Sequence, residues 1–79
     1  MMDKEIFVNL LKERQFKAVR TILNVMNVVD IALLLSELDE DKELALAFRL
    51  IQKEDAAEVF ANMDSDMQAY LVEMFTEKE

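Results

Sequence analysis

The chain has 79 residues, contains no Gly, Pro, Cys, His or Trp, and has a formal net charge of −8. Without Cys or His it has no disulfide, zinc finger, thiol nucleophile or Ser-His-Asp triad, and without Gly it has no phosphate-cradling loop. Hydrophobic residues make up 53% and charged residues 33%. This composition is typical of one acidic helical domain, and we predict that the chain is not an enzyme.

The distribution of charge and the length of the apolar runs indicate which kinds of partner the chain can bind. Residues 1–20 carry five basic and three acidic side chains, whereas residues 21–79 carry four basic and fourteen acidic ones. The acidic segment repels nucleic acid and anionic lipid and attracts cations or a basic partner, so we expect no nucleic-acid partner. No apolar run is longer than residues 31–35, far short of the roughly 20 residues that span a bilayer, so we expect no membrane insertion by this chain.

Helical periodicity begins at the N-terminus. A helix is predicted over 3–14, with Asp3 as its N-cap and an apolar face made by Ile6, Phe7, Leu10 and Leu11. A second helix is predicted over 15–26, with an apolar stripe of Phe16, Val19, Ile22, Leu23 and Met26. No linker-like stretch follows either segment, so we expect very short turns.

An internal repeat continues the pattern. Apolar anchors recur at intervals of 12 or 13 residues, at Met26, Leu38, Ile51, Met63 and Phe75. An apolar pair precedes each anchor by three and four residues, which is the buried stripe of a short helix. Helices are therefore predicted over 29–38, 40–51, 53–62 and 65–76, and three of the polar residues that follow the anchors are predicted N-caps: Asn27, Asp39 and Asp64.

The predicted fold class is all-α, with about six short helices stacked as a small right-handed, solenoid-like superhelix that is truncated. We expect one core, formed by Leu34, Leu38, Phe48, Ile51, Val59, Phe60, Met63, Leu71 and Phe75. If Phe60 is fully buried, Phe60→Ala is expected to destabilise the fold by about 3–5 kcal/mol.

Three segments carry a resemblance to a known family: residues 29–38, then Ala56-Ala57-Glu58-Val59-Phe60, then residues 63–69. In this register the stretch from Val19 to Phe75 resembles the cytosolic N-terminal domain of MgtE-type magnesium transporters. The resemblance implies that residues 1–79 are a single MgtE N-terminal-like helical domain. It also implies a fragment, because the CBS pair and the transmembrane domain of similar proteins are absent from it.

The resemblance further implies a magnesium-sensing role on the cytoplasmic side of the membrane. Such a domain docks on the CBS domains of the same polypeptide, within a homodimer, when Mg²⁺ fills acidic crevices between them, and the pore then closes. Glu58, the acid of the Ala-Ala-Glu segment, resembles a carboxylate of that interdomain metal site. We expect the site to be weak or incomplete in this chain, because Mg²⁺ keeps several waters and further carboxylates would come from the docked domain.

Two alternatives stay open. Flagellar motor-switch proteins contain similar stacks of short leucine-rich helices, so the chain could instead be a scaffold that binds a protein with or without magnesium. The identity of the ion is also open, because oxygen ligands bind Mn²⁺ and Ca²⁺ as well as Mg²⁺.

Overall fold

The computed structural model describes residues 3–76 and forms six α-helices over that range, with no strand. The all-α prediction is confirmed, and each predicted helix ends within two residues of the observed one. The helices are α1 (Lys4–Lys12), α2 (Phe16–Val25), α3 (Val28–Ser36), α4 (Asp41–Arg49), α5 (Lys53–Ala61) and α6 (Ser65–Thr76).

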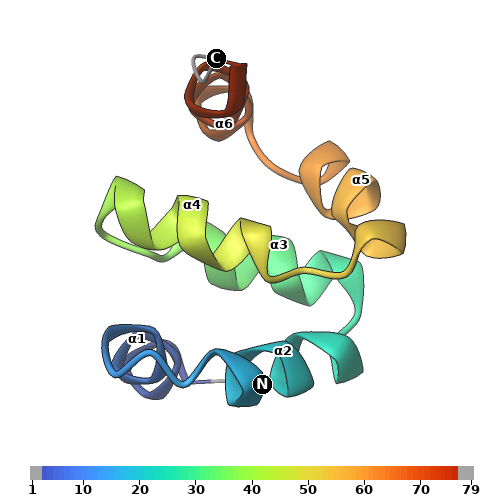
Figure 1. The fold of residues 1–79 in the computed structure, drawn as a ribbon. Coiled ribbons are helices and arrows are strands. Elements are labelled where there is room, and N and C mark those ends of the chain that lie inside the picture. Colours follow the sequence, from blue (N-terminus) through green and yellow to red (C-terminus); the bar gives the residue numbers. More distant parts are fainter. Residues whose placement is uncertain (1–2, 77–79) are drawn as a thin grey trace.

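The helices lie in the order of the chain from one end of the molecule to the other. Figure 1 shows α1 and α2 at the bottom, α3 and α4 in the middle, and α5 and α6 above them. α1 packs against α2 and α4, and α3 packs against α4 and α5. The body measures 29 × 23 × 21 Å. This order is compatible with the expected superhelix, whose right-handed sense stays a prediction.

The core draws on every helix, because each is too short to be stable without neighbours that cover its apolar stripe. Eight large side chains are essentially inaccessible to solvent: Phe7, Val19, Leu23, Ile31, Leu34, Leu35, Val59 and Leu71. Ile51 and Met63 are also buried. The predicted core is thereby confirmed at Leu34, Ile51, Val59, Met63 and Leu71.

The other predicted core residues lie at its edge. Leu38, Phe48, Phe60 and Phe75 are only half-buried, although all four pack against the core. The prediction that they are buried with the others is therefore confirmed only in part. The three phenylalanines lie where α4 meets α5 and α6, and the Phe48 ring contacts both of the others, edge-on to Phe60 and tilted to Phe75. In α1, Ile6 is 54% exposed, so the buried face of that helix is narrower than predicted.

The repeat has a structural cause in the way the helices end. Four anchors each donate their backbone N–H to the carbonyl three residues earlier, at 3.1–3.3 Å: Met26, Leu38, Ile51 and Met63. This bond tightens the last turn and satisfies one of the carbonyls left unpaired at a helix end. After three of the four anchors the next residue directly precedes a new helix: Asn27, Gln52 and Asp64. A helix of about nine residues with such a turn gives the 12-residue interval.

Two of the predicted caps after the anchors form as expected. The Asn27 Oδ1 accepts the Asp30 N–H at 2.9 Å, and the Asp64 Oδ1 accepts the Met67 N–H at 3.0 Å. The prediction that Asp39 caps a helix is wrong. The connection between α3 and α4 has one extra residue, which produces the single 13-residue interval and makes Glu40 the residue that precedes α4.

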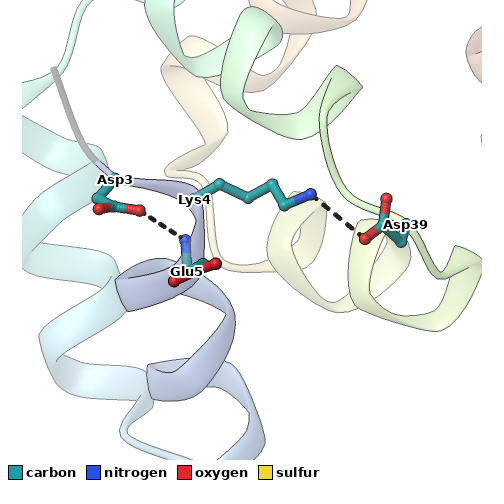
Figure 2. A network of polar contacts seen from close by, with 4 residues as sticks. All are labelled: Asp3, Lys4, Glu5 and Asp39. Atoms are coloured by element: carbon teal, nitrogen blue, oxygen red, sulfur yellow. Dashed lines mark hydrogen bonds and ion pairs between the residues drawn. The ribbon is translucent and has the colours of Figure 1, made fainter.

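Asp39 instead joins the N-terminal helix to the middle of the body. Its Oδ2 accepts a hydrogen bond from the Lys4 Nζ at 3.3 Å, in an ion pair between α1 and the α3–α4 connection. Figure 2 shows this pair beside the start of α1, where the Asp3 Oδ1 accepts the Glu5 N–H at 2.9 Å. The predicted N-cap at Asp3 is confirmed.

The turn from α1 to α2 has an unusual backbone at Arg14, whose φ is 60°. The Gln15 N–H bonds the Leu10 carbonyl at 2.9 Å and the Arg14 N–H bonds the Leu11 carbonyl at 3.1 Å. These two bonds form a Schellman motif, which needs a left-handed residue and usually takes Gly there. The chain contains no Gly, so an arginine adopts the left-handed conformation.

Candidate functional site

The predicted site residue, Glu58, lies on α5. Gln52 precedes this helix in an extended conformation, and its Nε2 donates to the Asp55 Oδ2 at 3.1 Å. Glu54 and Asp55 lie in the first turn, where negative charge is favoured by the helix dipole. Asp55 therefore stabilises the start of α5 through its charge and through the bond from Gln52.

The far end of α5 is held by two amide side chains. The Asn62 Nδ2 donates to the Glu58 carbonyl at 2.9 Å, and the Gln68 Nε2 donates to the Phe60 carbonyl at 2.7 Å. Each of these carbonyls also accepts a backbone N–H, from Asn62 and Met63 respectively, so the side-chain bond is a second one to the same oxygen. The backbone that carries Glu58 is therefore fixed at both of its ends.

Packing sets the direction of the Glu58 side chain. Val59 is fully buried and Phe60 is half-buried against Phe48, so these two side chains define the inward face of α5. Glu58 is exposed, about 100° around the helix from Val59. Glu54, one turn earlier on the same flank, is also exposed. The outward face of α5 thus presents two carboxylates whose Cβ atoms are about 6 Å apart in a regular helix.

The fit of a metal ion to this face is partial. Nowhere within residues 3–76 do three or more acidic side chains come together as a group that could hold a metal ion. Mg²⁺ is commonly bound through one or two carboxylates and keeps several waters. Glu58, with Glu54 beside it, could supply that number and no more. Two carboxylates on one helix are therefore too few to enclose an ion by themselves.

A second feature was not foreseen from the sequence. A groove of about 610 Å³ lies between the α1–α2 turn, α4 and α6, and four basic side chains line it: Lys12, Arg14, Lys42 and Arg49. The basic character of residues 1–20 was visible in the sequence. That Lys12 and Arg14 meet two basic residues from the acidic segment was not, because they are about 30 residues apart in the chain.

The fold and the exposed acidic helix define a small helical-repeat domain in which successive short helices share one core. A comparison with protein families assigns its class: residues 26–79 match the MgtE intracellular N domain. The chain belongs to this family, whose members are intracellular N domains of MgtE-type magnesium transporters. No individual curated protein matches the chain. None of the helices within residues 3–76 has the length and apolar character that crossing a membrane requires.

Proposed function

We propose that this domain senses cytosolic Mg²⁺ for a magnesium transporter and gates it by docking on the CBS domains of the same polypeptide. The proposal treats residues 1–79 as one such domain, acting within a homodimer on the cytoplasmic side of the membrane. Its support is the family match over residues 26–79 together with the exposure of Glu58 on the acidic flank of α5.

The proposed mechanism follows from charge. The chain has a net charge of −8, so another acidic domain repels it unless a cation lies between the two. Glu58 would bind the ion from one side, with Glu54 adding negative charge one turn away, and the docked CBS domain would complete the ligands. Bound Mg²⁺ would favour the docked, closed state because it binds that state better than the separated one.

Glu58→Ala in the complete transporter tests the proposal. The expected result is that channel closure needs a higher cytosolic Mg²⁺ concentration, measured as conductance against ion concentration. Glu73→Ala is the matched control, because Glu73 is likewise an exposed helical glutamate but lies on α6. Closing curves that are identical for the unmodified transporter and the Glu58 variant would contradict a role for this residue.

Folding must be shown to be intact in the same variant. Glu58 is exposed, so Glu58→Ala should change the free energy of unfolding of the 79-residue chain by less than about 0.5 kcal/mol. An NMR titration of this chain with Mg²⁺ should give small shifts near Glu54 and Glu58 that do not saturate at low ion concentration. Tight stoichiometric binding would contradict a site that another domain completes.

A protein-binding scaffold is the competing function. The observation that favours it is an exposed apolar stretch, in which Val25 is 82%, Val29 58% and Leu33 47% accessible. Val29 and Leu33 are four residues apart on α3 and therefore share one face. A scaffold would bind its protein target equally with and without Mg²⁺, whereas the sensor would dock on the CBS domains only when the ion is present.

A further inference from the structure

The groove between the α1–α2 turn, α4 and α6 has an apolar floor and a basic rim. Leu11 is buried beneath it, and three half-buried side chains complete the floor: Phe16, Leu46 and Met74. Its volume of about 610 Å³ is in the range of cavities that hold a ligand. The floor alone would suit any apolar group, so the rim decides what fits.

The rim is positive on a negative molecule. Lys12, Arg14, Lys42 and Arg49 are all exposed and line the groove, together with two acids, Glu40 and Glu43. Glu43 is only 8% exposed, so it lies beneath the rim. The lining carries four cations and two acids, a net charge of +2 in a chain of net charge −8, so the local field attracts negative charge.

The positive groups are spread along the groove. Lys42 and Arg49 are seven residues apart on α4, which places them on one face of the helix with about 10 Å of rise between them. An acidic segment with charges about two helical turns apart matches this spacing.

The backbone of Arg14 and the guanidinium of Arg49 are each held by contacts within the fold. Arg14 adopts the left-handed conformation, which is unfavourable for a residue with a Cβ, and such outliers are common at functional positions. The Arg49 guanidinium carbon lies 5.3 Å from the centre of the Phe75 ring, a cation–π contact between α4 and α6. Both observations favour a rim whose charges are positioned before any partner arrives.

We infer that this groove binds an acidic amphipathic helix of a partner protein. Apolar side chains on one face of that helix would pack on Phe16, Leu46 and Met74, while flanking Asp or Glu side chains would pair with the basic rim. The groove is built by α1, α4 and α6, whereas the acidic flank of the proposed ion site lies on α5. Binding in the groove is therefore independent of Mg²⁺ and of the proposed sensing function.

A designed peptide of about 14 residues tests the inference. It carries Leu or Phe at i, i+3, i+4 and i+7 and Glu at the flanking positions, with a fluorescent label for anisotropy measurements. The comparison peptide has Gln in place of every Glu. The Glu peptide is expected to bind the 79-residue chain with an affinity that falls as salt is added, and the Gln peptide is expected to bind at least tenfold more weakly. Equal binding of both peptides, or of neither, would overturn the inference.

The chain offers a matched pair of charge reversals. Lys42 and Lys17 are both exposed, and each is the second residue of its helix, but only Lys42 lines the groove. A glutamate is compatible with the helix dipole at either position, so both variants should fold. Lys42→Glu should weaken binding of the Glu peptide by about tenfold, and Lys17→Glu by less than about twofold. Equal weakening by the two variants would show that binding depends on overall charge, and would overturn the inference that the peptide binds in the groove.

Arg14→Gly separates binding from stability. Gly adopts this backbone conformation without strain, so the variant should have a higher thermal midpoint. Loss of the guanidinium should weaken binding of the Glu peptide. Arg14→Lys should retain binding, because it keeps the charge at the same place. A Gly variant that binds as well as the unmodified chain would contradict a role for Arg14. Self-association of the chain that Lys42→Glu abolishes would show that a second copy is the occupant and would overturn the assignment to another protein.

Discussion

The ring of Phe48 on α4 lies edge-on to the ring of Phe60 on α5, with centroids 6.3 Å apart and planes at 64°. Phe48 also lies 6.0 Å from Phe75 on α6. One side chain of α4 therefore contacts both of the helices that follow it. Edge-on aromatic pairs contribute about 0.5–1.5 kcal/mol beyond the area that they bury.

Phe60→Ala should lower the free energy of unfolding by about 2 kcal/mol, less than the loss for a fully buried phenylalanine, because Phe60 is half-buried. Phe60→Leu keeps most of the apolar contact and isolates the part that depends on the Phe48 ring. Urea denaturation of both variants measures the two contributions. A midpoint that Phe60→Ala leaves unchanged would contradict the packing of α5 on α4.

The N-cap of α3 gives a second prediction. The Asn27 Oδ1 accepts the Asp30 N–H, so Asn27→Ala leaves that amide without its side-chain partner. The expected loss is about 1 kcal/mol in the free energy of unfolding, whereas Asn27→Asp keeps an acceptor and should lose little. Thermal denaturation of the two variants should therefore separate them clearly, and equal midpoints would show that the cap bond is not important in solution.

Arg14→Gly is expected to stabilise the chain by up to about 1 kcal/mol, because Gly adopts a positive φ without the clash that a Cβ causes. Arg14→Ala is the control, since it removes the guanidinium but keeps the Cβ and the strain. Chemical denaturation should give the Gly variant a higher free energy of unfolding than both the Ala variant and the unmodified chain. If the Ala variant gains as much as the Gly variant, the effect comes from charge and not from backbone conformation.

The ion pair between Lys4 and Asp39 should add little to stability. The Asp39 side chain is 80% exposed and the Lys4 side chain 35%, so water and salt screen their attraction. Asp39→Asn is expected to change the free energy of unfolding by less than about 0.5 kcal/mol at physiological salt. A larger loss, measured at two salt concentrations, would indicate that this pair fixes α1 on the body.

The sequence was sufficient for the helices, because a repeat of apolar pairs and anchors depends on residues within one turn of each other. Asp39 shows where that reasoning fails: one extra residue before α4 moves the cap position to Glu40, and periodicity alone does not locate such an insertion. The half-burial of Phe48 and Phe60 depends on how α4, α5 and α6 pack together, which no local pattern reports.

Of the two candidate sites, the acidic flank of α5 could be predicted from the sequence and the basic groove could not. The outward direction of Glu58 follows from its place next to Val59 on a short helix, so sequence reasoning could reach it. The groove could not be predicted, because it requires Lys12 and Arg14 to face Lys42 and Arg49 across a tertiary contact between α1 and α4.

The stacking order of the helices also bears on how the chain reaches its fold. The helices pack mainly on neighbours one, two or three elements away, so each contact closes only a short loop of chain and loses little entropy. Domains rich in such local contacts fold in microseconds to milliseconds. The chain has no proline, so no prolyl bond can delay a part of the population for tens of seconds. Refolding followed by temperature jump or continuous-flow mixing, which resolve microseconds, should therefore show one rapid exponential that accounts for the whole amplitude.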